Sequence, residues 1–419
     1  MFKFLHTADI HLDSPLQSLE RYEGAPVDEL RLATRHALEN LVEVAIEERV
    51  AFVVISGDLY DRDWRDYNTG LFFVTQVAKL REEGIQVYVI TGNHDAANRM
   101  THSLPWPENV HFFSHNEPET LLDDVHGVAF HGQSFLTQHV TDDISSEYPA
   151  PRAGYFNIGL LHTSADGRKG HDPYAPCSLA NLGAKGYDYW ALGHVHTAEV
   201  VQTAPHIVFP GNTQGRHVRE TGAKGCYMAE VGDDHSVALR FRPTDVARWS
   251  VCTLNADEGR EAELEEAFFR EVVQLIRGSE TRAVAVRVRL EADGGAYRRL
   301  SMHSDNWRQR FRAIAVDAGG GSVWLEKLQV IRKDDATAPR NPGAGPLGEV
   351  QTLLDELRSD GGVLSEMAEE LSDLREKIAA ELQTGEGCPD PHDPGVIRSV
   401  LPEVEALLTG RLLPEGDAQ

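Results

Sequence analysis

Cysteine is scarce in this chain of 419 residues. The cysteines lie far apart in the sequence and form no CxxC pair: Cys177, Cys226, Cys252 and Cys388. Small secreted proteins rely on dense disulfide frameworks, and structural zinc sites often use paired thiolates. The sequence therefore argues against both, and we expect free thiols in a reducing compartment.

Long apolar runs are also missing. No stretch approaches the roughly 18–20 apolar residues that a membrane-spanning helix needs. The first residues, MFKFLHTADIH, begin apolar but lack the length and the small-residue cleavage site of a signal peptide. We expect this segment to form a β-strand and the protein to be cytoplasmic.

Positive charge is in short supply, with 40 Lys and Arg against 66 Asp and Glu and a formal net charge of −26. Proteins that bind nucleic acid normally carry a basic surface. The acidic excess is uneven, because residues 347–419 hold 17 acidic and five basic side chains, a net of −12. This balance argues against non-specific DNA binding but leaves local DNA contacts open.

The chain is long enough for two or three domains, since one hydrophobic core rarely organises more than about 250–300 residues. Up to about residue 243, short apolar strands alternate with helical patterns at about 28–49 and 68–83, and strands dominate after about residue 125. This order is typical of an α/β domain with a parallel sheet. We predict a two-sheet sandwich flanked by helices (αββα) over residues 1–243.

Three further regions follow. Residues 244–334 alternate strands and helices and predict a small α+β module, and residues 335–346 form a linker rich in Pro, Gly and Ala. Residues 347–419 read as helical, with apolar side chains at helical spacing at Leu364, Met367, Leu371, Leu374 and Ile378 and again at Val404, Leu407, Leu408 and Leu412. Such narrow stripes either pack on their own protein or form a partner-binding arm, and both interpretations carry equal weight.

Five short polar motifs occur at or just beyond the ends of apolar strands: Asp9-Ile10-His11, Gly57-Asp58, Gly92-Asn93-His94-Asp95, Leu161-His162-Thr163 and Gly193-His194-Val195-His196. Ligands collect at such strand ends in open α/β sheets. We expect an extended backbone to point Asp9 and His11 the same way, and Gly57 and Gly193 to permit tight turns. Each motif alone is weak evidence, but together they predict a site for two divalent ions.

The set DxH, GDLYDR, GNHD, LH and GHVH resembles the calcineurin-like metallophosphoesterase superfamily. Within it, the chain is similar to SbcD-type DNA repair exonucleases. The stretches closest to the bacterial YhaO-like branch are HTADIHLDSPLQSL at 6–19, VVISGDLYDR at 53–62 and HTSADGRKGHDPYAPC at 162–177. The resemblance in motifs covers about residues 1–230.

The resemblance implies a role for each motif residue. One metal ion would be held by Asp9, His11, Asp58 and His196, and the second by Asp58, Asn93, His162 and His194. The family commonly uses manganese, and these ligand types also suit iron or zinc. His94 would be the acid or the orienting group beside the leaving oxygen. For Asp95 two roles stay open, a partner that fixes the tautomer of His94 and a loop cap.

The resemblance also implies a function, a metal-dependent DNA nuclease that cleaves phosphodiesters as an exonuclease or endonuclease. Two cations about 3.5–4 Å apart can activate a water and offset charge on the phosphoryl oxygens. SbcD-type enzymes act in DNA repair with an SMC/SbcC-like coiled-coil ATPase, which would dock on the C-terminal helices, with residues 244–334 as a capping domain. A homodimer is also possible. Candidate phosphate contacts are Arg62, Arg65, Arg99, Arg168, Lys169, Arg216 and Arg219.

Two other functions stay open. A phosphatase or phosphodiesterase could act on small or protein substrates, since GDLYDR is close to the protein phosphatase motif GDxxDRG. Asp63 stands in place of the final Gly, however, and GNHD in place of GNHE, which favours a nuclease. A scaffold subunit that binds an ATPase and has weak activity is the third possibility, and the intact set of metal ligands argues against it.

Overall fold

The computed structural model describes residues 1–14, 32–61, 67–97, 105–165, 175–256, 261–333, 352–357, 361–370, 393–398, 400, 401, 404 and 408. The chain divides into two compact units. The first comprises Met1–Ser250 with Leu275–Val286 and Ser322–Glu326, and the second comprises Val251–Gln274, Arg287–Gly321 and Lys327–Gln419. Among the described helices, none combines the length and the apolar character needed to cross a membrane.

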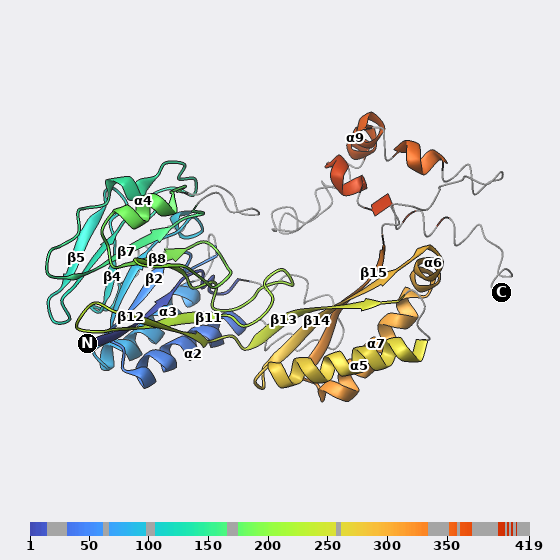
Figure 1. The fold of residues 1–419 in the computed structure, drawn as a ribbon, viewed down its shortest axis with the longest axis horizontal. Helices are drawn as coiled ribbons and strands as arrows, with labels where there is room; N and C mark the ends of the chain where they lie inside the picture. Colours follow the sequence, from blue (N-terminus) through green and yellow to red (C-terminus); the bar gives the residue numbers. More distant parts are fainter. Residues whose placement is uncertain are drawn as a thin grey trace. The chain divides into compact units, whose positions relative to one another are not determined.

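The first unit contains two six-stranded sheets (Figure 1). The order in one is β12 (Val237–Pro243), β11 (Gly225–Val231), β1 (Phe2–Thr7), β2 (Phe52–Ser56), β3 (Gln86–Ile90) and β4 (Val110–Phe112). Strands β1 to β4 run parallel, while β11 pairs antiparallel with β1 and β12. The predicted parallel sheet is therefore present, with an antiparallel edge added by chain that follows the last motif.

The second sheet has the order β5 (Glu119–Asp123), β6 (Val128–Gly132), β7 (Phe156–His162), β8 (Tyr189–Gly193), β10 (His206–Phe209) and β9 (Glu199–Thr203). Its four central strands are parallel and its two edge pairs are antiparallel. Aromatic rings from both sheets fill the space between them. Phe52 of β2 lies 4.8 Å from Phe130 of β6, and Phe4 of β1 lies 5.2 Å from Tyr189 of β8, centroid to centroid.

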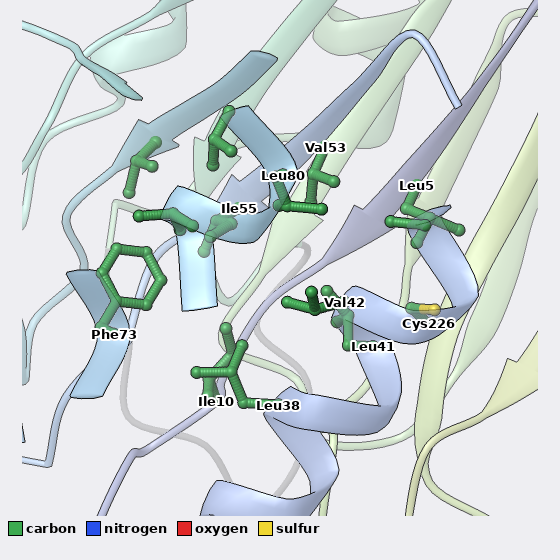
Figure 2. Close-up of a cluster of buried hydrophobic side chains, with 14 of the residues drawn as sticks. Leu5, Ile10, Leu38, Leu41, Val42, Val53, Ile55, Phe73, Leu80 and Cys226 are labelled. Atoms are coloured by element: carbon green, nitrogen blue, oxygen red, sulfur yellow. The ribbon is translucent and has the colours of Figure 1, made fainter. Parts of the chain in front are cut away.

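Helices cover the outer faces of the sandwich. Figure 2 shows Leu38, Leu41 and Val42 of α2 (Ala33–Glu48) directed toward the side chains of the first sheet. Phe73 and Leu80 of α3 (Tyr67–Glu82) belong to the same apolar cluster. On the second sheet, α4 (Leu179–Ala184) contributes Leu182 to a separate cluster. The predicted two-sheet sandwich flanked by helices is confirmed.

A third sheet has the order β13 (Ala247–Asn255), β14 (Ala283–Ala292) and β15 (Val323–Arg332), and three helices lie between its strands in sequence: α5 (Glu261–Gly278), α6 (Gly294–Met302) and α7 (Ser304–Gly319). Phe268 of α5 packs on Phe311 of α7, with 4.7 Å between the ring centroids. The sequence pattern predicts every one of these elements except α6, which begins with two glycines. The predicted boundary between residues 243 and 244 stays a prediction, because the division into compact units passes through this sheet.

The C-terminal region is helical where the structure describes it. Short helices at 352–357 and 394–398 accompany α9 (Gly361–Glu370). An apolar cluster joins them, formed by Leu354, Leu364, Ile397 and Leu401 with Leu357 and Met367 at its border. Two residues of the predicted stripe are therefore covered by the chain itself. Val404 and Leu408 of the second stripe are exposed. The linker 335–346 and the other stripe residues, Leu371, Leu374, Ile378, Leu407 and Leu412, lie outside the described residues.

Candidate metal centre

The motif residues come together at the carboxyl ends of strands from both sheets of the sandwich. Asp9, Asp58 and Asn93 follow β1, β2 and β3, while His162 ends β7 and His194 follows β8. Backbone hydrogen bonds connect these loops: Asp9 N donates to Gly57 O at 3.0 Å and Thr163 N donates to Gly193 O at 3.2 Å. The ends of five neighbouring parallel strands thus hold one polar cluster.

The backbone at the ligands is not extended, contrary to the expectation from the DxH pattern. Asp9, His11, Asp58 and His194 have positive φ angles of 50°, 45°, 51° and 91°. Residues other than glycine rarely adopt this region, and such strained positions concentrate at functional sites. The strain is held in place by neighbouring loops, because His11 N donates to Asp58 O at 3.0 Å and His194 N donates to the Asp9 carboxylate at 2.9 Å.

One group of donor atoms is formed by Asp9, His11 and His196. The Nε2 atoms of His11 and His196 face each other at 3.2 Å. Asp9 Oδ1 lies 4.0 Å from His11 Nε2 and 3.6 Å from His196 Nε2. These are three of the four residues that the family resemblance assigns to the first ion.

A second group surrounds His162. Its Nε2 lies 3.0 Å from Asn93 Oδ1 and 3.4 Å from Asp58 Oδ2. Asp58 Oδ2 is also 3.8 Å from His11 Nε2, so this carboxylate stands between the two groups, as a bridging ligand would. The ring of His194 lies 5.3 Å from that of His162, centroid to centroid.

The donor set fits divalent ions. Bonds of about 2.1 Å place adjacent ligand atoms about 3.0–3.4 Å apart in octahedral or tetrahedral geometry, which is the separation between the facing atoms here. Two imidazole nitrogens facing each other beside buried carboxylates need a cation or a proton between them. The described donors are oxygen and nitrogen atoms without thiolate, which suits manganese, iron or zinc.

Hydrogen bonds to the far nitrogen of two ligating histidines hold their rings in place. His162 Nδ1 donates to Ser56 O at 2.9 Å, and His196 Nδ1 lies 2.6 Å from Glu220 Oε1. Burial alone would lower the pKa of both histidines, but the surrounding carboxylates, Asp58 for His162 and Asp9 with Glu220 for His196, raise each pKa to about 9. The same negative field attracts metal cations.

Glycine is required at two of the turns. A Cβ atom on Gly57, whose φ is +94°, would lie 2.3 Å from His162 Nδ1. A Cβ atom on Gly193 would lie 1.9 Å from Ser56 O. The strand ends approach each other too closely for any side chain at these positions.

His94 lies with His11 and Asp58 in a third group of donor atoms, and its Nδ1 forms an ion pair with Asp61. Its Nδ1 lies 2.9 Å from Asp61 Oδ1. Burial alone would lower the pKa of His94, but Asp58 and Asp61 outweigh burial and raise it. The sequence offered one signal for Asp61, since it is the second aspartate of GDLYDR.

Asp95 caps the loop instead, at the start of a short 3-10 helix (Asp95–Ala97). Its carboxylate accepts backbone N–H groups from Leu59, Tyr60 and Gly92 at 3.1, 2.8 and 3.0 Å. Burial, and then the proximity of Asp58, raise the pKa of Asp95 to about 7. Of the two roles left open for Asp95, these hydrogen bonds match the loop cap.

The predicted phosphate contacts divide into two sets. Arg62, Arg65, Arg99, Arg168 and Lys169 lie outside the described residues. Arg219 is exposed, while Arg216 is only 8% exposed and lies 3.8 Å from Asp61 and 3.7 Å from Glu220. Arg216 is thus buried and forms ion pairs with carboxylates of the site. Glu220 also lies at the site, and no local motif in the sequence marks it.

Comparisons with known proteins identify the family. A calcineurin-like phosphoesterase model matches residues 2–198, and a model of the middle domain of metallophosphoesterase YhaO matches residues 249–331. The uncharacterized metallophosphoesterase YhaO of Bacillus subtilis (strain 168) is 33% identical over 297 residues, which are 70% of this chain and 72% of that protein. A solved dimetal phosphatase from Danio rerio shares 12% identity with a TM-score of 0.36, over 58% of this chain and 96% of its own. The chain belongs to the calcineurin-like metallophosphoesterases, a family of metal-dependent hydrolases of phosphoester bonds.

Proposed function

We propose that this chain is a manganese-dependent DNA nuclease, the catalytic subunit of a repair complex with an SMC/SbcC-like coiled-coil ATPase. The observation that carries the nuclease proposal is the placement of His94, which groups with the donor atoms of His11 and Asp58 and forms an ion pair through its Nδ1 with Asp61 Oδ1 at 2.9 Å. A phosphodiester leaves as an alkoxide, which is a poor leaving group without a proton donor. A held imidazole next to the reacting phosphorus meets that need.

Each residue of the centre has a defined task in this proposal. When bound, two divalent ions polarise the phosphoryl oxygens and provide a nucleophile at neutral pH. Asp58 would be shared by the two ions, since its Oδ2 faces His11 on one side and His162 on the other. The ion pair between His94 Nδ1 and Asp61 would leave Nε2 of His94 to protonate the departing oxygen. His94 N also donates to Asp58 Oδ1 at 3.0 Å, which ties the proton donor to the shared ligand.

The sequence around the centre supports DNA over a phosphoprotein as the substrate. Protein phosphatases of this superfamily carry GDxxDRG and GNHE, whereas this chain has Asp63 after GDLYDR and Asp95 after GNH. Both carboxylate oxygens of Asp95 accept hydrogen bonds from the backbone, three in all. The similarity of the motif set to SbcD-type nucleases supports the same substrate.

The exposed apolar side chains of the C-terminal helices support the partner. Val400, Val404 and Leu408 follow one another at intervals of four residues and are 42%, 37% and 41% exposed. In a continuous helix this spacing would put them on one face, as in amphipathic helices that bind a groove or a coiled coil. The cluster of Leu354, Leu364, Ile397 and Leu401 provides a base for that face.

End-labelled single-stranded and double-stranded DNA, incubated with the purified chain and Mn²⁺, tests the nuclease. We expect metal-dependent degradation that Asp58→Asn and His94→Ala abolish. The matched control is His126→Ala, because His126 also pairs with a carboxylate, Asp123 at 2.7 Å, on the turn between β5 and β6. Hydrolysis of bis-p-nitrophenyl phosphate with intact DNA would favour the small-substrate phosphodiesterase, and inertness toward both would favour the scaffold.

Titration against the coiled-coil segment of an SbcC-type ATPase tests the partner. We expect Val404→Asp and Leu408→Asp to weaken binding at least tenfold. Leu136→Asp changes an exposed leucine of the first unit and should leave binding unchanged. Equal binding by all three variants would contradict the proposed docking face.

A further inference from the structure

A buried carboxylate lies behind His196, on the side away from the ions. Glu220 is 6% exposed, follows His196 by 24 residues and lies beyond the segment that the phosphoesterase family model matches. We propose that Glu220 is the positioning residue of His196, and that the loop from Gly211 to Glu220 exists to hold this carboxylate in place. The proposal rests on the two-metal centre of the proposed function but not on DNA as the substrate.

The geometry fixes which nitrogen of His196 carries the proton. A carboxylate can only accept, so the 2.6 Å contact requires that His196 Nδ1 donates to Glu220 Oε1. In the neutral ring that binds a metal ion, Nε2 then carries the lone pair, and it faces His11 Nε2 at 3.2 Å and Asp9 Oδ1 at 3.6 Å. Carboxylates that bind the far nitrogen of a ligating histidine fix its orientation and raise its basicity.

The second oxygen of Glu220 is occupied by its own loop. Oε2 accepts Asn212 Nδ2 at 3.0 Å and the backbone N–H of Arg216 at 2.6 Å. Loops normally run over the surface because buried backbone groups need partners. The segment from Gly211 to Arg216 is buried throughout, and Glu220 is one of the side chains that satisfy it.

Two further contacts anchor this loop to the start of β13. Trp249 Nε1 donates to Gly215 O at 2.9 Å, and Gln214 Nε2 donates to Ala247 O at 2.7 Å. Lys224, just beyond the loop, donates from Nζ to His196 O at 2.8 Å. Lys224 and Glu220 thus contact the backbone and the ring of His196. Moving the Glu220 side chain would break its hydrogen bonds with the loop.

Arg216 balances the charge of this arrangement. Its guanidinium lies 3.7 Å from Glu220 Oε1 and 3.8 Å from Asp61 Oδ2, and it donates to Ser14 Oγ at 3.4 Å. Ser14 in turn donates to Asp61 Oδ2 at 2.7 Å. The carboxylates behind His196 and behind His94 thus share one buried cation, which keeps both anionic in a site that already contains Asp9 and Asp58.

The test separates positioning from mere support of the loop. Glu220→Gln and Glu220→Ala remove the charge behind His196. Asn212→Ala removes one donor to Oε2, so it loosens the same loop while the contact between Glu220 and His196 remains. For each full-length variant, the free Mn²⁺ signal in electron paramagnetic resonance measures how many ions bind and how tightly, and thermal unfolding in EDTA measures the stability of the metal-free chain.

We expect the unaltered protein to bind two ions and the Glu220 variants to bind one of them about 10–100-fold more weakly. Asn212→Ala should unfold at a lower temperature and still bind both ions within about threefold. Unchanged ion binding by folded Glu220→Gln overturns the proposal, and so does an equal loss in Asn212→Ala. If Glu220→Ala does not fold, Glu220→Gln decides alone. Failure of the unaltered protein to bind two ions would instead refute the metal centre and the function built on it.

Discussion

Gly57→Ala should damage the metal centre through one methyl group. Gly57 has a φ of +94°, and the added Cβ would lie 2.3 Å from Nδ1, 2.8 Å from Cγ and 3.1 Å from Cβ of His162. An ordinary contact needs roughly 3.5 Å, so the His162 ring must move by about 1 Å. Because His162 is fully buried, nothing beside it can give way easily.

The free energy of unfolding of the metal-free protein should fall by about 2–3 kcal/mol. The left-handed conformation costs an alanine about 1–2 kcal/mol, and the lost hydrogen bond from His162 to Ser56 O adds about 1 kcal/mol. Gly84→Ala is the matched control, since Gly84 has a φ of +76° and its Cβ would meet nothing within 4 Å. It carries the conformational cost without the clash.

Ion binding separates the two variants. Moving the ring takes His162 Nε2 out of reach of the atoms that it now faces, Asn93 Oδ1 at 3.0 Å and Asp58 Oδ2 at 3.4 Å. In a Mn²⁺ titration, Gly57→Ala should lose one tight ion while Gly84→Ala keeps two. Urea unfolding in EDTA gives the stability of each. If Gly57→Ala binds both ions as the unaltered protein does, the close approach of the two strand ends does not position His162 and the reasoning is refuted.

Three further outcomes can be measured on the same protein. Burial lowers the pKa of His6 to about 3, so between about pH 6.5 and pH 3 only the unfolded chain takes up a proton there. The free energy of unfolding should therefore be highest above pH 6.5 and fall by up to about 5 kcal/mol toward pH 3. Urea unfolding in EDTA should show His6→Asn with a shallower pH dependence, and equal slopes would contradict this. Asp61→Asn should lower kcat on bis-p-nitrophenyl phosphate about 100-fold with Mn²⁺ binding unchanged, because it frees the His94 ring; unaltered turnover would rule out that role. Phe268→Ala should destabilise the second unit by about 3–5 kcal/mol in denaturant unfolding and leave ion binding intact, and a loss below about 1 kcal/mol would show that its contact with Phe311 does not matter.

Hydropathy was sufficient for most of the fold. The apolar runs at 52–56 and 86–90 form buried strands of the parallel sheet, and the predicted helix at 68–83 differs by one residue at each end from α3. The helix α6 was missed because it opens with Gly294 and Gly295, which disfavour a helix. Its N-cap is Asp293, whose side chain accepts from Ala296 N.

The sequence reveals those residues of the site that are neighbours in a motif, but not those that meet only in the folded protein. Residues next to one another in a motif, such as Asn93 and His94, are visible in the sequence because the strand end presents them together. Glu220 reaches His196 only after the chain has passed through β9 and β10 and returned, so no spacing reveals it. The choice between Asp61 and Asp95 as partner of His94 likewise depends on how two loops meet in space, since both aspartates occupy plausible positions in their motifs.

The left-handed backbone at Asp9, His11, Asp58 and His194 has a consequence for protein engineering. Each such residue costs the fold about 1 kcal/mol or more, so glycine at any of them would relieve strain in the metal-free chain. A screen that rewards thermal stability alone can therefore select substitutions at the ligands of the metal centre. Directed evolution of this protein has to score ion binding or turnover in every round, because a substitution that relieves this strain also removes a metal ligand.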